Sequence, residues 1–358
     1  MAAFSPLLDL PPFPADRYGL LADRLKRILS TGNDVVFAQA EAIHALEAAA
    51  TSLGRSGLTA LNVVTSQYGG YFGEWLRRAG TDVVTVAAEP GLPVTADAVE
   101  AALGARPDIG LIAMVHAETS SGILNPLPAI AAVARTHGAL LVVDAVASVG
   151  GHPLYVDAMG IDLCVIGAQK ALAGPAGLSA LSVSPRAWAS MQPQSAPSNL
   201  SLLDLKTNWL DRGRGVVPGM PSALEFWALD AALDRVEAET LPVCIERHRD
   251  AAHATRDGVR RLGAALWIED DTQASALTTA VRVPSGIDAG RLVEMARTLG
   301  GNVSPGIGAM ADWIVRIEHT GQRATDAAVL QNLTAYGLAL QRLGVPAHLD
   351  QMAKALRP

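Results

Sequence analysis

Hydrophobic residues along the first half of the chain recur with two alternating periods. Short apolar runs bounded by turns are typical of buried strands, and apolar residues at three- and four-residue spacing are typical of helices. The pattern predicts strands at 34–38, 60–65, 82–86, 109–116, 139–144, 163–166 and 178–184, and helices at 15–29, 40–53, 69–79, 95–103 and 126–137. Because strands and helices alternate, we expect a large α/β domain with a mostly parallel sheet.

The second half of the chain predicts a smaller C-terminal α+β domain. Proline and glycine are frequent over 190–220, which predicts a loop. The expected elements that follow are helices at 222–238, 241–262, 288–299 and 326–343 and strands near 277–283 and 313–318. We therefore divide the chain into an N-terminal arm (1–14), a large domain (15–250) and a small C-terminal domain (251–358). The proline-rich arm is expected to be extended, because proline lacks the amide donor that helices and central strands need.

Composition and charge narrow the function classes. The chain has 358 residues, of which 50% are hydrophobic, and its formal net charge is −7. An acidic chain lacks the basic field that attracts nucleic acid or anionic membranes, so neither partner is expected. No apolar run approaches the roughly 20 residues of a membrane span, and the first residues lack a signal-peptide pattern. Cys164 and Cys244 are expected to be buried thiols in the cytoplasm, with one disulfide as the alternative.

Motifs of other α/β enzymes are missing from the sequence. It contains no G-x-G-x-x-G after a strand, no phosphate-binding P-loop and no G-x-S-x-G nucleophile elbow. His248 and His253 are five residues apart, a spacing that does not place both on one helical face as a zinc pair requires. No metal site is therefore expected.

Candidate chemistry gathers in the stretch 140–178. Asp144 ends one predicted strand and Lys170 follows another, so both are expected at the carboxyl edge of the sheet, where ligands bind. A lysine among apolar neighbours tends to lose its charge and become nucleophilic. A buried aspartate beside a cationic ring nitrogen is the usual partner in pyridoxal chemistry. The alternative is an ordinary strand-end aspartate and a surface lysine.

The sequence from Asp144 to Leu178 resembles the lysine segment of the class V aminotransferases of pyridoxal-phosphate fold type I. HAETSSGILNPL at 116–127 and RIEHTG at 316–321 resemble two further segments of this family, and the resemblance covers about residues 35–345. It implies a large domain with a mostly parallel seven-stranded sheet, a smaller α+β C-terminal domain and a homodimer.

The resemblance also assigns candidate roles to matching positions. Lys170 would form a Schiff base with the pyridoxal ring and shuttle a proton, and Asp144 would keep the ring nitrogen protonated. The other candidate cofactor-binding residues are Glu41, Tyr68, Thr119, Ser120, Val146 and Gln169. Arg316 is the candidate substrate-binding residue, because arginine grips a carboxylate bidentately. Alternatively, Tyr68 is a core aromatic, and Arg316 forms an ion pair with Glu318.

Two departures from the family concern the cofactor phosphate. Class V members usually carry a G-S-G-T turn that cradles the phosphate before the first long helix, whereas this chain has Glu41, Ala42 and Ile43 there. A carboxylate repels a phosphate dianion. Met220 aligns with a second phosphate-binding residue, a threonine lent by the partner subunit.

The glutamate is typical of one group within class V. Together with LEAAATSL at 46–53 and YGGYFGEW at 68–75, Glu41 resembles the pyridoxamine–pyruvate aminotransferases, which act on unphosphorylated vitamin B6. Glu41 is then expected to accept a hydrogen bond from the free 5′-hydroxymethyl group. The alternative is that Glu41 caps the helix, whose dipole favours an acid at this end. A second substrate-binding arginine of that group aligns with Ile307, so either the acceptor is not pyruvate or Arg316 alone holds its carboxylate.

These observations predict an aminotransferase that moves an amino group from an amine, either free pyridoxamine or an amino acid, to a 2-oxo acid. The expected cofactor is pyridoxal 5′-phosphate or unphosphorylated pyridoxal or pyridoxamine. The alternatives are a conventional alanine/serine–glyoxylate-type aminotransferase, a pyridoxal-dependent lyase, and a non-catalytic relative that acts as a binding partner. A desulfurase is disfavoured, because no cysteine follows Cys244.

Overall fold

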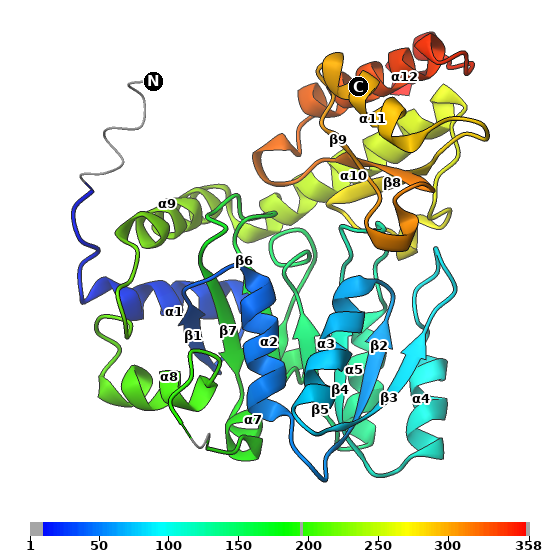
Figure 1. Cartoon of the computed structure of the whole chain (residues 1–358). Helices are drawn as coiled ribbons and strands as arrows, with labels where there is room; N and C mark the ends of the chain where they lie inside the picture. The colour runs from blue at the N-terminus through cyan, green and yellow to red at the C-terminus, as the bar shows by residue number, and fades with distance from the viewer. Residues whose placement is uncertain (1–9, 194–195, 356–358) are drawn as a thin grey trace.

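A seven-stranded sheet forms the centre of the protein (Figure 1). The computed structural model describes residues 10–193 and 196–355. The strands are β1 (Asp34–Ala38), β2 (Thr59–Val64), β3 (Asp82–Ala87), β4 (Ile109–Val115), β5 (Leu140–Asp144), β6 (Leu163–Gly167) and β7 (Ser179–Val183). Their order is β1-β7-β6-β5-β4-β2-β3, and only the pairings of β7 with β1 and β6 are antiparallel. The predicted mostly parallel sheet is confirmed.

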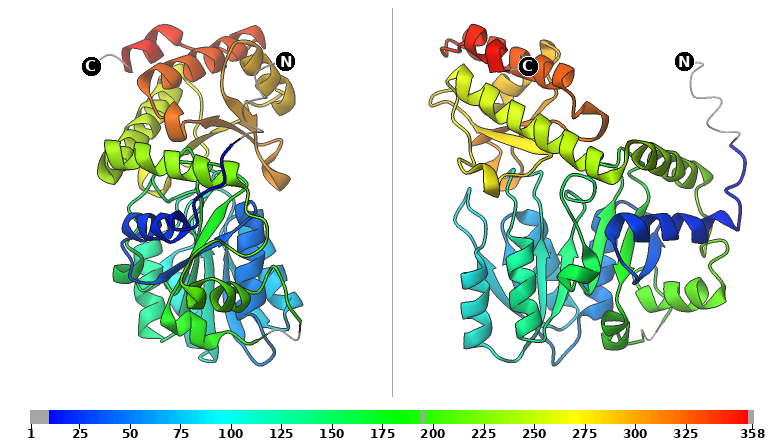
Figure 2. Two further views of the ribbon diagram at one scale, coloured as in Figure 1. Left: turned by 90° about the vertical axis from the view of Figure 1, so that its left-hand side faces the viewer. Right: turned by 180° about the vertical axis from the view of Figure 1, so that it is seen from behind.

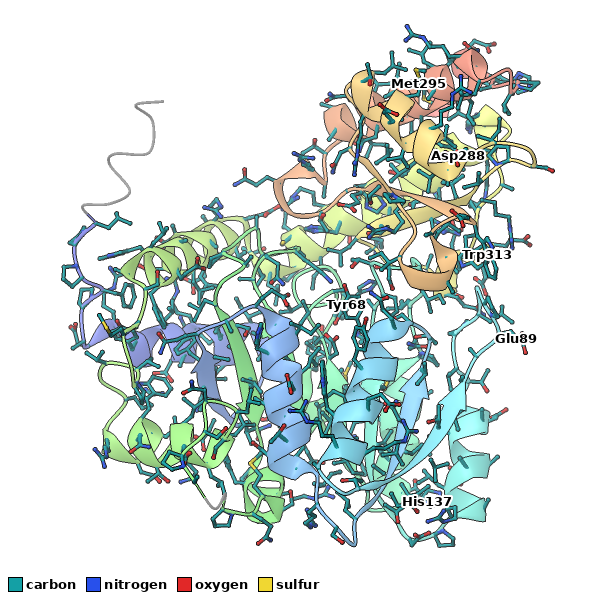
Figure 3. All side chains as sticks on the ribbon, viewed as in Figure 1. Tyr68, Glu89, His137, Asp288, Met295 and Trp313 are labelled. Carbon is teal, nitrogen blue, oxygen red and sulfur yellow. The ribbon has the colours of Figure 1, made fainter. Side chains whose placement is uncertain are left out.

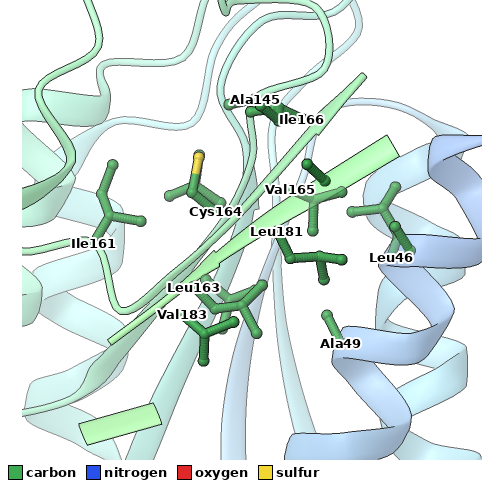
Figure 4. Close-up of a cluster of buried hydrophobic side chains, with 14 of the residues drawn as sticks. Leu46, Ala49, Ala145, Ile161, Leu163, Cys164, Val165, Ile166, Leu181 and Val183 are labelled. Carbon is green, nitrogen blue, oxygen red and sulfur yellow. The ribbon is translucent and has the colours of Figure 1, made fainter. Parts of the chain in front are cut away.

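Helices cover both faces of this sheet, as the apolar strands require. Their bounds are α2 (Ala42–Leu53), α3 (Gln67–Arg78), α4 (Ala96–Ala105) and α5 (Leu127–Thr136). α2 and α3 pack together on one face, and α4 and α5 pack together on the other (Figures 1 and 2). Figure 4 shows Leu163 and Val165 of β6 beside Leu46 and Ala49 of α2, with Cys164 on the other side of the strand. Alternate residues of the strand therefore fill two separate layers.

The C-terminal part of the chain forms a second, smaller core. An antiparallel sheet in the order β8-β10-β9 consists of β8 (Thr278–Arg282), β9 (Val303–Pro305) and β10 (Ile314–Glu318). The helices beside it are α10 (Leu241–Leu262), α11 (Ala289–Thr298), α12 (Asp326–Arg342) and α13 (Leu349–Ala355). Its buried cluster runs from Ala251 to Met352, whereas the large cluster ends at Val236. Figure 2 shows the C-terminal part above one end of the large sheet. The domain division near residue 250 stays a prediction.

Several short elements were not predicted. The stretch 190–220, expected to be a loop, contains the helix α8 (Leu202–Asn208) and a 3-10 turn at Leu210–Arg212. The hydroxyl of Ser201 accepts a hydrogen bond from the amide of Asp204 and so caps α8. Short helices α6 (Val156–Met159) and α7 (Pro185–Ser190), together with α13 and β9, were also missed. Elements of three to seven residues hold too few apolar repeats to reveal a period.

The arm and the first helix attach the N-terminus to the large domain. Residues 10–14 form neither helix nor strand, as predicted, while residues 1–9 of the arm lie outside the described residues. α1 (Arg17–Leu29) runs beside α9 (Ala223–Glu239), and Arg24 makes ion pairs with Asp230 at 2.6 Å and Asp234 at 2.7 Å. Among the described helices, none is long and apolar enough to cross a membrane.

An aromatic cluster holds the arm against α9, and this gives the first testable prediction. The fully buried ring of Phe226 lies 4.7 Å from Tyr18, 5.3 Å from Phe37 and 5.6 Å from Phe13 between ring centroids. We expect Phe226→Ala to lower the free energy of unfolding by about 3–5 kcal/mol in urea titration, because a large cavity remains. Leu224→Ala, on the same helix but 41% exposed, should change it by about 0.5 kcal/mol or less. Equal losses in both variants would contradict this account.

Candidate active site

A cavity of about 260 Å³ opens where the large sheet meets the C-terminal part. All candidate residues except Ser120 and Gln169 line it. The wall is formed by Glu41, Ala42, Ile43, Leu46, Tyr68, Val115, Ala117, Glu118, Thr119, Asp144, Val146, Ala147, Lys170, Ile307 and Arg316. Tyr68 lies at the end of the sheet below the C-terminal part, and His137 lies at the opposite end (Figure 3). The fold thus gathers residues from α2, α3, β4, β5 and β10 and from the loops that follow β4, β5, β6 and β9.

Thr119 connects the candidate lysine to the candidate arginine. Lys170, which follows β6, donates a hydrogen bond from Nζ to Thr119 Oγ1 at 3.0 Å. Arg316, on β10, donates from Nη1 to the Thr119 carbonyl at 2.7 Å. Burial lowers the pKa of the Lys170 ammonium, because a charged amine is costly away from water. Lys170 is thus half-buried in the cavity wall rather than on the outer surface.

Asp144 ends β5 as a buried carboxylate facing the cavity. Its Oδ1 accepts a hydrogen bond from the Val146 amide at 2.9 Å. Burial raises the pKa of this carboxyl, while the nearby Lys170 opposes the rise. A carboxylate in this setting is stabilised by a further cationic partner in the cavity.

Glu41 has two partners, one from its own helix and one from the lysine segment. Its Oε2 accepts a hydrogen bond from the Ile43 amide at 2.8 Å, which caps the N-terminus of α2. Its Oε1 accepts one from Nε2 of Gln169 at 2.8 Å. The capping alternative is therefore confirmed as a contact, and the same carboxylate also lines the cavity. The sequence could not show this double engagement, because Gln169 is 128 residues away.

Two candidate residues stand behind the cavity wall. The hydroxyl of Ser120 is buried and donates to Glu118 Oε2 at 3.2 Å. Gln169 lines a neighbouring pocket rather than this one, and its contact with the cavity runs through Glu41. Their predicted direct contacts with a cofactor stay predictions.

Arg316 and Tyr68 each combine features of both alternatives. Arg316 Nη1 lies 3.6 Å from Glu318 Oε1, so the expected ion pair exists, yet the guanidinium also faces the cavity. Tyr68 follows Ser66, whose side chain caps α3, and the tyrosine is half-buried in the cavity wall rather than in the core. Burial raises the pKa of its hydroxyl.

Comparison with known proteins identifies the family. The family model for "Aminotransferase class-V" matches residues 23–300. The pyridoxamine–pyruvate transaminase of Mesorhizobium japonicum is 35% identical over 342 residues, covering 94% of this chain and 86% of the relative. The chain belongs to the class V aminotransferases.

Two further relatives agree with this assignment. The L-aspartate–glyoxylate aminotransferase of Paracoccus denitrificans is 30% identical over 296 residues, covering 80% of this chain and 74% of the relative. The crystal structure of the pyridoxamine–pyruvate aminotransferase from Mesorhizobium loti superposes with a TM-score of 0.90 at 34% identity, covering 95% of this chain and 87% of that one. The predicted aminotransferase activity and fold type I architecture are thereby confirmed, and the family uses a pyridoxal phosphate-type cofactor.

The composition of the site fits the pyridoxal ring of such a cofactor. The cavity offers an amine with a lowered pKa and a buried carboxylate from adjoining strand ends, with an aromatic side chain nearby. Among the residues that the structure describes, no group of three or more histidine, cysteine or acidic side chains could hold a metal ion. Both cysteines are buried free thiols, so the disulfide alternative is wrong.

Glu118 is a site residue of this aminotransferase that the sequence prediction missed. It is buried in the cavity wall and accepts a hydrogen bond from Thr65 Oγ1 at 3.0 Å. Burial, reinforced by the charge of Asp144, raises the pKa of the Glu118 carboxyl to about 7. The residue was visible in HAETSSG, but the motif itself does not tell which of its polar side chains turns inward.

The buried Glu118 gives a prediction about pH. The folded state holds this proton up to about pH 7, above the ordinary value of 4.5, so unfolding releases it and stability falls as pH rises between these values. Relative to the native enzyme, Glu118→Gln should therefore gain up to about 3 kcal/mol of unfolding free energy between pH 5 and pH 8. Urea titrations at both pH values measure this difference.

A matched variant tests whether burial is the cause. Glu74→Gln removes an exposed carboxylate from α3. Its unfolding free energy should change between the two pH values by the same amount as that of the native enzyme. If the unfolding free energy of Glu118→Gln also changes by this amount, Glu118 does not hold a proton in the folded protein.

Proposed function

We propose that this class V aminotransferase transfers the amino group of free, unphosphorylated pyridoxamine to a 2-oxo acid. The relative with 35% identity is named for pyridoxamine and pyruvate. The observation that carries the proposal is the position of Glu41 at the N-terminus of α2, inside the cavity. Homodimer formation and a cytoplasmic location belong to the same proposal; the buried free thiols support the latter.

The N-terminus of α2 is a poor site for a phosphate in this chain. Such a helix end attracts anions because its amides are free and its dipole is positive. Here the Glu41 carboxylate already occupies the Ile43 amide at 2.8 Å. A phosphate charge about 4 Å from that carboxylate would be repelled by about 4 kcal/mol at an effective dielectric of 20. A neutral hydroxymethyl group can instead donate a hydrogen bond to Glu41.

Gln169 holds the Glu41 carboxylate in place. Its amide nitrogen donates to Glu41 Oε1 at 2.8 Å, and it directly precedes Lys170 in the chain. The position of the carboxylate and the position of the amine are therefore coupled through two successive residues. Met220, at the second phosphate-binding position of the family, is 97% exposed and offers no hydroxyl to an anion.

Lys170 supplies the reactive amine. Burial lowers its pKa, which favours the neutral form that attacks an aldehyde carbon and later accepts a proton. Thr119 Oγ1 accepts a hydrogen bond from Nζ at 3.0 Å and so orients the amine within the cavity. Lys170 would attach pyridoxal covalently and carry the proton that moves during amino transfer.

Asp144 and the side chains near it would position the ring. The pyridoxal ring, when bound, supplies an electron sink for the bonds at the amine-bearing carbon. The buried Asp144 carboxylate would hold the proton on the ring nitrogen, since its own burial makes a cationic partner favourable. Val146 and Tyr68 both line the cavity and would contact the two ring faces. Thr119, with Ser120 behind Glu118, lies on the wall that would face the ring hydroxyl.

The reaction is a balanced exchange between pyridoxamine and the acceptor. Pyridoxamine is oxidised to pyridoxal while the 2-oxo acid is reduced to an amino acid, and the amino group and the carbonyl oxygen trade places. Arg316 would hold the carboxylate of the acceptor, because its guanidinium is partly buried and faces the cavity.

The selectivity for the unphosphorylated ring can be measured directly. We expect the purified enzyme to bind pyridoxal at least about tenfold more tightly than pyridoxal phosphate in absorbance titrations, because Glu41 repels the phosphate. Glu41→Ser removes the charge but keeps a helix-capping hydroxyl, and should shrink this ratio by at least about tenfold. Glu47→Gln removes a carboxylate of the same helix that does not line the cavity, and should leave the ratio unchanged. Co-purification of tightly bound pyridoxal phosphate would overturn the proposal.

The role of Lys170 has a separate test. After incubation with pyridoxal and borohydride, mass spectrometry should find the pyridoxyl mass on Lys170. We expect Lys170→Ala to lose this label and about 10²–10⁴-fold of the transfer rate, since the proton-carrying amine is removed. Lys206→Ala, which removes a surface lysine paired with Asp211 at 2.7 Å, should retain both. A full transfer rate in folded Lys170→Ala would contradict this role of Lys170.

A further inference from the structure

The turn that carries Lys170 contains a residue in an unfavourable backbone conformation. Ala173, three residues after the lysine, has a φ of +53°, in the left-handed region that residues other than glycine seldom adopt. The Ala173 amide donates a hydrogen bond to the Lys170 carbonyl at 3.0 Å, and Arg235 of α9 donates one to the Ala173 carbonyl at 2.8 Å. Such a conformation persists only where surrounding contacts impose it. The position of the lysine therefore depends on what packs against this turn.

One contact on the lysine turn comes from Gly321, which begins the 3-10 turn Gly321–Arg323 after β10. A Cβ atom at Gly321 would lie 2.9 Å from the Lys170 carbonyl oxygen and 3.1 Å from Ala173 Cβ. Gly321 also has a φ of +60°, which favours glycine. The backbone of Gly321 thus packs directly against both ends of the lysine turn, with no room for a side chain between them.

Two successive residues of α10 hold Gly321 in this position. Arg247 donates from Nη1 to the Gly321 carbonyl at 2.6 Å, and the Gly321 amide donates to Nε2 of His248 at 2.9 Å. Because Nε2 accepts, the ring proton is on Nδ1, which donates to the Cys244 carbonyl at 2.7 Å. The imidazole is fully buried, and burial lowers its pKa, which favours this neutral form. Both ring nitrogens of His248 are therefore used to connect α10 to Gly321.

We propose that His248 is a positioning residue for Lys170: by holding Gly321 against the lysine turn, it keeps the amine in the active-site cavity. His248 itself lines neither this cavity nor the neighbouring pocket that Lys170 shares with Gln169. Without the bond from Gly321 to His248, the turn can relax and the amine can move towards water in that more open pocket. The proposal rests on the proposed role of Lys170 as the reactive amine.

The first test measures the reactivity of Lys170 in the full-length enzyme without pyridoxal. Acetic anhydride acetylates only the neutral amine, so mass spectrometry of the Lys170 peptide over a pH series gives a labelling midpoint. We expect the native midpoint to lie below the ordinary lysine value of 10.5, because burial disfavours the charged form. His248→Leu should raise this midpoint by at least about half a pH unit, because the amine becomes better hydrated. His248→Gln keeps one acceptor and one donor and should stay near the native midpoint.

A pair of glycines tests the contact between Gly321 and the lysine turn. Gly321→Ala forces a methyl group against the Lys170 carbonyl, and should raise the labelling midpoint as His248→Leu does. Gly344→Ala carries similar backbone strain, because Gly344 has a φ of +80°, but open space surrounds it. This variant should leave the midpoint unchanged. His253→Leu, which removes an exposed histidine of α10, should leave it unchanged as well.

Amino transfer from pyridoxamine gives a second measurement. Since a displacement of about 1 Å can cost about 10²-fold in rate, His248→Leu should lower kcat by at least about tenfold, and His248→Gln by less than about threefold. An unchanged labelling midpoint in folded His248→Leu, or an equal rise in His248→Gln, would overturn the role of His248. If the native enzyme does not turn over pyridoxamine while the labelling midpoints follow the expected order, the proposed function is wrong and the role of His248 stands.

Discussion

The candidate active site of this aminotransferase depends on one lysine amine held at the junction of two cores. Lys170 follows β6 of the large sheet. Thr119 accepts one hydrogen bond from Lys170 and one from Arg316 of the C-terminal sheet, and so connects the two side chains. Burial between the two cores makes the ammonium form costly and lowers the pKa of Lys170. The sheet, its covering helices and the small domain all serve to maintain this arrangement.

Charge around that amine then decides what the site can accept. Glu41 places a negative charge at the helix end where an anion would otherwise bind, and Gln169 holds it there. Ile307, which lines the same cavity, adds no charge to it. Both features act through the same physical rule, because an unpaired charge in a confined, partly dry cavity is expensive. Under the proposed function, Glu41 directs the site towards an uncharged ring substituent.

The sequence predicted the larger elements because their apolar repeats are long enough to show a period. The sheet strands and the helices α2, α3, α10 and α12 were found within a few residues. β9 was missed because three residues form a strand only by pairing with β10. α8 was missed because prolines and glycines surround it, while its stability comes from a cap and from packing. The candidate site residues came from family segments around Glu41, Tyr68, Thr119, Lys170 and Arg316, whereas Glu118 was not singled out within its segment.

The sequence by itself predicted the candidate chemistry of this protein, since Asp144 ends one strand and Lys170 follows the next at one edge of a parallel sheet. It also showed that Glu41 stands where the family usually has its phosphate-binding turn, because residue types can be compared position by position. Only the tertiary structure decided what each polar group faces. Gln169 donates a hydrogen bond to Glu41, Ser120 donates one to Glu118, and Ile307 lines the same cavity as Arg316. These contacts join residues from separate elements, and a one-dimensional pattern carries no information on the directions in which side chains point.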